Sequence, residues 1–361
     1  MIGSWTAAFL LGLAASSAAA KTPEKSNRSL KRRAPGVDRV AHNVIPLKPV
    51  NSVRRHHTGR RRRQSPGNAT AGLGAINNPG QATMSLRLDG KSNCQTGPKF
   101  KGNFTGGQIE NVNFNITYGS GILTGKFGWE DITIANVTVK DAQVAVVDQA
   151  YFTFGVSGLF GLAFASLTSE FPGSDPTKNN PTHYMTYEPV FYKMVDQHLS
   201  LPTFSFAPDR DGPNGYFSVG GISPVNTTGK TASASILTSK DTRSKPSISR
   251  PDYYYINIDA IAISIARSFN PPATIASSTG FYEVPCNATA PKLAITVGGM
   301  NFPVSADDLI VRPLLDPATN QCIVEVQDGG GDYILGATFL NNVLSTFDLG
   351  NLEVRFTALS Q

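Results

Sequence analysis

Hydrophobic and polar residues alternate in many short segments of this 361-residue chain, which is the pattern of β-strands with one buried face. The clearest case is residues 114–134. Its apolar positions are Phe114, Ile116, Tyr118, Ile122, Phe127, Trp129, Ile132 and Ile134. Gly119-Ser120-Gly121 interrupts the alternation and allows a sharp reversal, while Gly125 and Gly128 let the long arm coil. The pattern predicts a β-hairpin with Tyr118 at its tip, bent over a neighbouring site. An ordinary hairpin is the alternative.

Helical periodicity is scarce. Residues 189–199 form the clearest predicted helix, with Pro189 in its first turn. The expected buried positions are Val190, Met194, Val195, His198 and Leu199. A shorter helix is expected at 305–309, with Ser305 as its N-cap. Everything else reads as short strands between turns, so we expect an all-β fold, long enough for two lobes.

The first 20 residues carry no charge and contain an apolar run from Trp5 to Ala15, followed by small residues. This run is short for a membrane span and fits a cleaved secretory signal. A signal anchor is the alternative.

Residues 21–63 contain 14 basic and two acidic residues, a net charge of +12, and cannot bury a core. The whole chain has 32 basic and 26 acidic residues, so the part from Gln64 onward has 18 and 24, a net charge of −6. A basic tract can bind nucleic acid or anionic membranes. Residues 31–33 and 60–63, however, look like dibasic processing sites, which favours a removed pro-segment. We therefore expect no nucleic-acid partner and no stable membrane insertion.

Asn-X-Ser/Thr sequons indicate passage through the secretory pathway. They begin at Asn68, Asn103, Asn115, Asn136, Asn226 and Asn287. The sequence ends at Gln361 without an apolar tail, so we expect a freely secreted or vacuolar luminal product.

Four segments, taken together and in order, resemble the pepsin-like aspartic protease family. They are the 114–134 hairpin, residues 158–163, residues 253–262, and residues 333–340 followed by 345–350. The resemblance covers roughly Thr83 to the C-terminus. It implies a bilobal all-β fold that hydrolyses peptide bonds. It also implies a substrate-covering flap formed by Tyr118, Gly119, Ser120 and Gly121.

The resemblance divides the chain into five parts. These are a signal peptide (1–20), a basic pro-segment (21–63), an N-terminal lobe with the flap (64–222), a crossing segment (223–252) and a C-terminal lobe (253–361). In the family, a basic pro-segment covers the acidic cleft at neutral pH and leaves when carboxylates protonate. We expect a monomer without a cofactor, with a polypeptide substrate or peptide ligand as its partner.

The chain has three cysteines. Cys286 and Cys322 match the family's C-terminal-lobe disulfide, and closing a loop of this size stabilises by roughly 3 to 4 kcal/mol in the entropic model. Cys94 is left over, which suggests that its usual partner is missing. No Cys-x-x-Cys occurs and the five His are scattered or in the pro-segment, so we expect no metal site.

Pepsin-like catalysis uses two facing carboxylates that share one proton, each placed by a hydrophobic-hydrophobic-Asp-Thr-Gly turn. The alternating segment 83–88 ends at Asp89, which matches the first catalytic Asp, but Gly90 and Lys91 follow in place of Thr and Gly. A plain Asp-Gly turn is the alternative. For the second, no Asp lies between Asp259 and Cys286. The remaining candidates, Asp332 and Asp348, match structural positions of the family.

Losing one positioned acid or base costs about 10²- to 10⁴-fold in rate. We therefore expect an endopeptidase by ancestry with little or no activity in this form. A non-catalytic relative that binds extended peptides is the second hypothesis, and an unstable, non-functional product is the third. Mis-assigned exon boundaries or alternative splicing would explain two interruptions at the two catalytic turns, and sequencing the transcript would test this.

Overall fold

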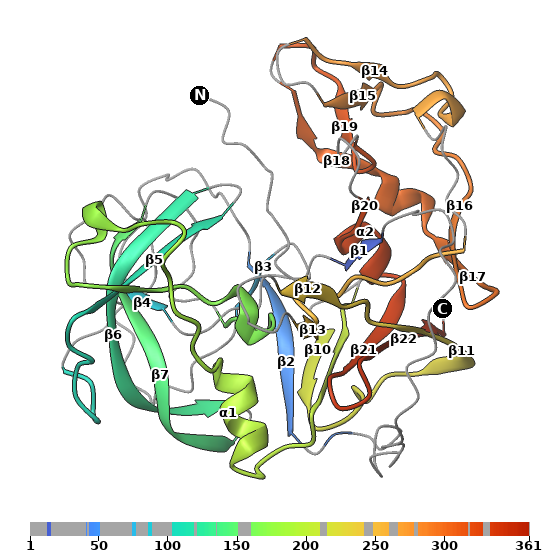
Figure 1. The fold of residues 1–361 in the computed structure, drawn as a ribbon. Helices are drawn as coiled ribbons and strands as arrows, with labels where there is room; N and C mark the ends of the chain where they lie inside the picture. Colours follow the sequence, from blue (N-terminus) through green and yellow to red (C-terminus); the bar gives the residue numbers. More distant parts are fainter. Residues whose placement is uncertain are drawn as a thin grey trace, which may run out of the picture. The chain divides into compact units, whose positions relative to one another are not determined.

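Strands dominate the computed structural model of this chain (Figure 1). The residues described are 13–15, 41, 43–50, 74–76, 86–88, 103–118, 121–134, 136–150, 160–209, 215–241, 248–259, 266–277, 281–316, 318–327 and 333–360. They divide into two compact units. The predicted all-β, bilobal class is confirmed.

Unit 1 contains the described residues of Ala41–Pro202 and Asp211–Gly220. Its main sheet has five strands in the order β4-β7-β6-β5-β8. They are β4 (Leu86–Leu88), β7 (Val137–Ala150), β6 (Gly121–Ile134), β5 (Val112–Tyr118) and β8 (Glu170–Pro172). Strand β4 runs parallel to β7, and the other neighbours are antiparallel. A second group consists of β10 (Gly215–Val219), β2 (Asn43–Val50) and β3 (Gly74–Ile76), with β2 antiparallel to β10 and parallel to β3.

The core of the five-stranded sheet is apolar and partly aromatic. It consists of Phe114, Leu123, Phe127, Ala145 and Val147. The rings of Phe114 and Phe127 meet edge to face with centroids 5.5 Å apart, a favoured aromatic geometry. The predicted alternation is only partly observed in β5, where Phe114 and its neighbour Asn113 are both buried and Asn115 and Ile116 are both half-buried. In β6 the buried residue near the tip is Leu123, whereas Ile122 is exposed. This follows from the pairing, because Leu123 lies opposite Ile116 on the core face.

Helix α1 (Val190–Asp196) confirms the predicted helix but is shorter than expected. Pro189 is its N-cap, and Val190, Phe191 and Met194 are its buried residues. His198 and Leu199 are exposed, because the helix ends at Asp196 and His198 adopts a positive φ of 58°. The buried face therefore includes Phe191 in place of these two residues.

Unit 2 contains the described residues of Gly12–Val40, Thr203–Arg210 and Gly221–Gln361. Four strands follow one another in the order β11-β22-β21-β9. They are β11 (Thr227–Ser235), β22 (Glu353–Leu359), β21 (Val343–Asp348) and β9 (Thr203–Ala207). All six residues of β21 are buried, as expected of an inner strand, and Phe204 stacks on Phe347 at 4.8 Å.

A smaller four-stranded sheet in unit 2 has the order β14-β15-β19-β18. Its strands are β14 (Thr274–Ile275), β15 (Tyr282–Val284), β19 (Cys322–Val324) and β18 (Ile310–Leu315).

Three further pairs of strands are β16 (Leu293–Val297) with β17 (Met300–Val304), β12 (Ser239–Asp241) with β13 (Ile248–Arg250), and β20 (Tyr333–Leu335) with β1 (Leu13–Ala15). The other helical segments are α2 (Ala337–Leu340) and the 3₁₀ turns Ala165–Leu167, Pro176–Lys178, Ala266–Ser268 and Ala306–Leu309. The last of these confirms Ser305 as an N-cap, since its side chain accepts from the backbone N–H of Asp307.

Two segments differ from expectation. The strand expected from Tyr253 onward is absent from 253–259, where only Ile256 forms a single-residue bridge; residues 260–265 lie outside the described part. Conversely, the basic segment contains strand β2, although its composition predicted no element. The strand itself is locally apolar, since Asn43–Val50 reads NVIPLKPV with Lys48 as its only charged residue, and its backbone pairs with β10 along five residues.

Candidate active site

Strand β4 leads the chain to the first candidate catalytic residue. It pairs in parallel with β7, and its last residue, Leu88, lies opposite Val147. Val147 is fully buried in the core of the five-stranded sheet. Asp89 follows Leu88 directly in the sequence, but it lies outside the described residues, as does Cys94. Its role in a catalytic dyad stays a prediction.

The hairpin β5–β6 forms at the predicted place. Its register pairs Tyr118 with Gly121, so that only Gly119 and Ser120 connect the two strands. Those two residues and the Tyr118 side chain lie outside the described part. Next to the tip, Thr117 lies opposite Ile122, and both are exposed. An apolar side chain near the tip of an exposed hairpin is available for contact with a ligand.

Gly125 is required by the close approach of two strands. A Cβ at this position would lie 2.1 Å from the carbonyl oxygen of Val146, so any other residue would displace backbone. The register of β6 and β7 shifts between Thr124 and Gly125. The sequence suggested only that Gly125 lets the strand coil. The close contact with Val146 restricts position 125 more strictly, because it leaves no room for a side chain.

A pair of amides ties the other side of the hairpin to a neighbouring loop. The side chains of Asn113 on β5 and Asn179 donate to each other at 2.9 and 2.8 Å, and the Asn113 amide also donates to the carbonyl of Gly173. Asn113 is 2% exposed. The sequence did not reveal this role, because Asn113 stands at a strand position where a polar residue is ordinary. In the structure, its buried side chain anchors the hairpin.

The acidic residues considered for the second catalytic position have structural partners where they are described. Asp259 is exposed, and one of its carboxylate oxygens accepts from the backbone N–H of Gly299 at 2.7 Å. Asp348 is buried and accepts from the backbone and side-chain nitrogens of Asn351, at 3.0 and 2.6 Å. Both carboxylates therefore stabilise turns. Asp332 lies outside the described residues.

The structure contains the Cys286–Cys322 disulfide, with Cα atoms 5.0 Å apart. Cys322 is in β19 and Cys286 is in the turn after β15. Of the sequon asparagines, Asn103, Asn136, Asn226 and Asn287 are exposed, Asn115 is half-buried on β5, and Asn68 lies outside the described residues. Glycosylation at all six stays a prediction.

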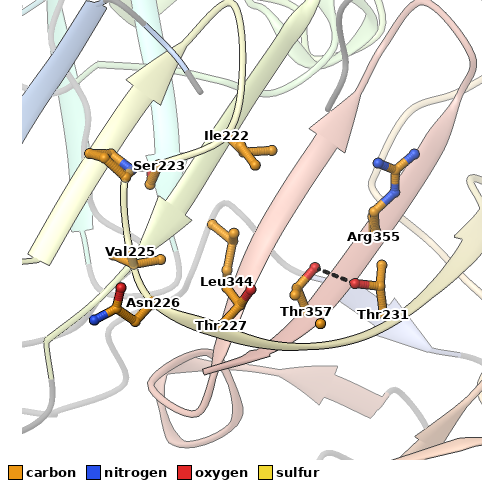
Figure 2. A pocket seen from close by; sticks show the side chains of 11 residues that line it. Ile222, Ser223, Val225, Asn226, Thr227, Thr231, Leu344, Arg355 and Thr357 are labelled. Atoms are coloured by element: carbon orange, nitrogen blue, oxygen red, sulfur yellow. Dashed lines mark hydrogen bonds between the residues drawn. The ribbon is translucent and has the colours of Figure 1, made fainter. Parts of the chain in front are cut away.

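Unit 2 contains an open cavity of about 640 Å³ between the 222–229 segment and strands β21 and β22 (Figure 2). It is lined by Ile222, Ser223, Pro224, Val225, Asn226, Thr227, Gly229, Thr231, Leu344, Arg355 and Thr357. The hydroxyls of Thr231 and Thr357 are 3.0 Å apart and hydrogen-bonded to each other. No carboxylate lines this cavity, so it cannot support the acid–base chemistry that the sequence predicts.

Within the described residues, no cluster of three or more His, Cys, Asp or Glu side chains is arranged to bind a metal ion. In the same part of the chain, no helix combines the length and hydrophobicity needed to cross a bilayer.

Comparison with known proteins identifies the family. A sequence model described as eukaryotic aspartyl protease matches residues 84–271 and 259–359. A protein of Aspergillus fumigatus named "Probable aspartic-type endopeptidase" is 32% identical over 311 residues, covering 74% of this chain and 69% of that one. Gastricsin of Oryctolagus cuniculus is 26% identical over 291 residues, covering 68% and 67%. The matches thus span about two thirds of these relatives.

Among solved structures, the crystal structure of an aspartic proteinase from Irpex lacteus superposes with a TM-score of 0.55. The superposed part covers 78% of this chain and 88% of the Irpex lacteus chain. The sequence identity is 17%, so this similarity supports the fold alone. Together, the strand order, the hairpin with its two-residue connection and the sequence matches show that this chain belongs to the eukaryotic aspartyl protease family.

Proposed function

We propose that this chain is a pepsin-like aspartic endopeptidase by descent that has little or no peptidase activity in this form. The observation that carries the proposal is the missing second carboxylate. No Asp lies between Asp259 and Cys286, and the carboxylates of Asp259 and Asp348 are occupied as hydrogen-bond acceptors in turns. One carboxylate cannot both activate a water and donate a proton to the peptide carbonyl in the same step.

A peptidase assay tests this proposal. Purified protein is incubated with denatured haemoglobin near pH 4, with and without a statine-type inhibitor, and an Asp89→Asn variant serves as the matched control. We expect no inhibitor-sensitive cleavage and no difference between the two proteins. Inhibitor-sensitive cleavage that the Asp89→Asn variant loses would overturn the proposal and establish Asp89 as catalytic.

The second candidate function is binding of extended peptides without hydrolysis. It is supported by the retained hairpin, whose Ile122 side chain is 41% exposed beside the tip. An extended peptide that pairs with a strand gains backbone hydrogen bonds, while pockets for its side chains give specificity. In this reading, Tyr118, Gly119, Ser120 and Gly121 form a cover over a polypeptide ligand.

Peptide binding is tested by calorimetry with a library of extended peptides. Ile122→Ser is expected to weaken binding, whereas Thr133→Ser at the far end of β6 keeps its hydroxyl and should bind as the parent does. A cooperative unfolding transition is required in the same preparation. A cooperatively folded protein that binds no peptide contradicts this function, and the absence of such a transition supports a non-functional product.

Passage through the secretory pathway completes the proposal. Residues 1–20 serve as signal and 21–63 as a basic pro-segment, and the product is a glycosylated monomer in the vacuolar lumen or outside the cell. Strand β2 (Asn43–Val50) lies inside the proposed pro-segment, so processing near residues 60–63 separates it from the chain that follows. Amino-terminal sequencing of the secreted product and its mobility after endoglycosidase treatment test these steps.

A further inference from the structure

Strand β20 of unit 2 has its partner strand at the other end of the sequence. Among the described strands, β20 pairs with β1 alone. The two run antiparallel, with Leu13 opposite Leu335 and Ala15 opposite Tyr333, and Figure 1 labels β1 next to β20 and α2. Strand β1 lies inside residues 1–20, the proposed secretion signal. The strand that completes this sheet therefore belongs to a segment that the proposed processing removes.

Removal of β1 leaves one edge of β20 open. In an antiparallel ladder, the N–H and C=O groups of alternate residues point toward the neighbouring strand. No other strand in the described part of the chain takes up these groups of β20. Unpaired backbone groups at a strand edge are costly to bury and act as a template for another extended chain. The processed protein therefore offers an edge to which a new strand can be added.

The side chains of β20 divide between the interior and the surface. Leu335 is 4% exposed, whereas Ile334 is 60% exposed. Gly336, the N-cap of α2, follows directly, and Phe339 and Leu340 of that helix are buried. Leu335 and α2 therefore anchor β20 in unit 2, while Ile334 is available for contact with a partner.

We propose that, once residues 1–20 are removed, β20 binds an extended polypeptide as an antiparallel strand in the place of β1. The strand seen there indicates the kind of occupant, a short stretch of small apolar residues, which is Leu-Ala-Ala in β1. Backbone hydrogen bonds give such a site its affinity, and contact with exposed side chains gives it selectivity. Ile334 favours an apolar residue in the ligand.

This site is distinct from the hairpin β5–β6, which belongs to unit 1, whereas β20 belongs to unit 2. The inference rests on the proposed removal of the signal and does not depend on peptidase activity. It adds a second place at which the chain can hold an extended polypeptide.

A fluorescently labelled peptide with the sequence of residues 10–18 tests the proposal by polarisation with the purified secreted protein. Two matched peptides carry one backbone N-methyl group each, on Ala14 or on Ala15. The N–H groups of adjacent residues in a strand point in opposite directions, so only one of the two methyl groups interrupts the pairing. We expect one methylated peptide to bind roughly tenfold or more weakly and the other to bind as the unmodified peptide does.

Two protein variants test the contact with the ligand. Ile334→Thr keeps a β-branched side chain but is less apolar, and it should weaken binding severalfold. Ile275→Thr is the matched control, because Ile275 on β14 of the same unit is also 60% exposed, and it should bind as the parent does. Hydrogen exchange should show slower exchange of the amides of residues 333–335 when the peptide is added.

Three results would overturn the inference. Binding that both methyl groups leave unchanged, or weaken equally, is adsorption rather than strand pairing. Amides of residues 333–335 that are already protected without peptide show that the edge is covered. Sedimentation then distinguishes a second copy, which gives a dimer, from another segment of the same chain.

Amino-terminal sequencing of the same preparation separates this inference from the proposal on which it rests. A product that begins at Met1 contradicts the proposed signal. A processed product that binds no peptide is the third overturning result, and it contradicts the β20 site alone.

Discussion

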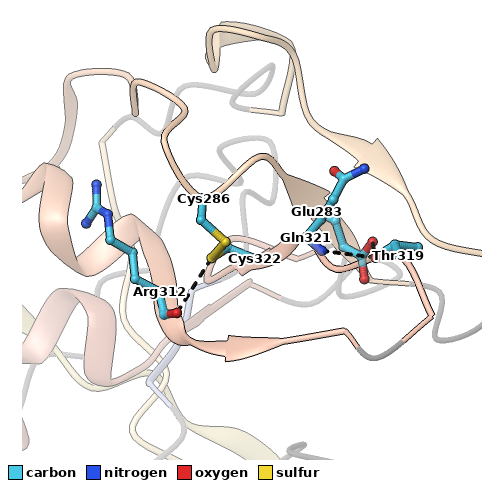
Figure 3. Close-up of a disulfide and its surroundings, with 6 residues drawn as sticks. All are labelled: Glu283, Cys286, Arg312, Thr319, Gln321 and Cys322. Carbon is cyan, nitrogen blue, oxygen red and sulfur yellow. Dashed lines mark hydrogen bonds between the residues drawn. A yellow bond between two sulfur atoms is a disulfide. The ribbon is translucent and has the colours of Figure 1, made fainter.

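Strands β6 and β7 of unit 1 are 14 residues long each, whereas the strands of the small sheet in unit 2 have between two and six residues. The long strands bury an apolar face that includes Leu123, Phe127 and Val147. The short strands have less side-chain surface to bury. They are linked by the Cys286–Cys322 disulfide (Figure 3).

The comparison shows two ways to stabilise a β-sheet within one chain. Apolar packing is insensitive to redox state and depends little on pH. A cross-link depends on redox conditions and suits an oxidising compartment. Changes to the apolar core of unit 1 should therefore act alike at every pH, whereas the stability of the small sheet should depend on the redox state of the medium.

The largest effect is expected from Phe127→Ala. Phe127 is fully buried and its ring meets Phe114 and Tyr187 at 5.5 and 5.0 Å. Removing such a ring costs about 3–5 kcal/mol of unfolding free energy, because a cavity remains. Urea unfolding measures the loss, which should be equal at pH 4 and pH 7. Ile122→Ala on the same strand is the control and should change stability by about 0.5 kcal/mol or less; similar losses for both would contradict the assigned core.

The disulfide is expected to contribute nearly as much, but only to unit 2. Replacing both Cys286 and Cys322 by Ser opens a loop with a sequence separation of 36 residues, a loss of about 3–4 kcal/mol in the entropic model. Hydrogen exchange localises the effect. Amide protection should fall in β15, β18 and β19 and persist in β5 and β6. An equal loss of amide protection in both sheets would show that the disulfide does not act on the small sheet separately from unit 1.

A smaller effect is expected from Gly125→Ala. The new methyl group would meet the Val146 carbonyl at 2.1 Å, and overpacking of this kind costs about 1–3 kcal/mol. Gly161→Ala is the matched control, because a Cβ there has no neighbour within 4 Å. Proteolysis of the hairpin and the urea midpoint measure the outcome. If Gly125→Ala unfolded at the same urea concentration as Gly161→Ala, strands β6 and β7 would lie farther apart at this position than the structure shows.

Local signals in the sequence account for much of the fold. The hairpin at 114–134, the helix after Pro189 and the Ser305 cap each depend on residues close in sequence, and each forms. The residues that face the core follow less directly, because the shift in register at Gly125 depends on how β6 pairs with β7. Burial of Phe191 in place of Leu199 depends in the same way on where α1 ends.

The candidate site is less predictable than the fold. Family resemblance pointed to Cys286 and Cys322, and the structure joins them. The hydrogen bond from Thr319 to Glu283 depends on the pairing of β15, β19 and β18 and has no local pattern. The same holds for Asn113 and Asn179, which are 66 positions apart. Long-range pairing decides such contacts, and it is not encoded in any short segment.

The smallest expected effect comes from a carboxyl pair in unit 1. Burial first, and the neighbouring Asp196 second, raise the pKa of Glu188, while Lys193 at 3.5 Å lowers it. The raised folded-state pKa means that its stabilisation is present in acid and lost as the pH rises. The Glu188 side chain is 35% exposed, however, so solvent screens the interaction to less than about 1 kcal/mol.

In Glu188→Gln, the midpoint of thermal unfolding should therefore rise relative to the parent at pH 7 and change less at pH 4. The rise should be small, because the Lys193 ammonium already compensates part of the charge on Glu188. Thermal scans of the parent and the variant in one buffer series measure the difference. If Glu188→Gln lowered the midpoint equally at pH 4 and pH 7, Glu188 would act through its ion pair with Lys193 alone, and burial of its carboxyl would not limit stability.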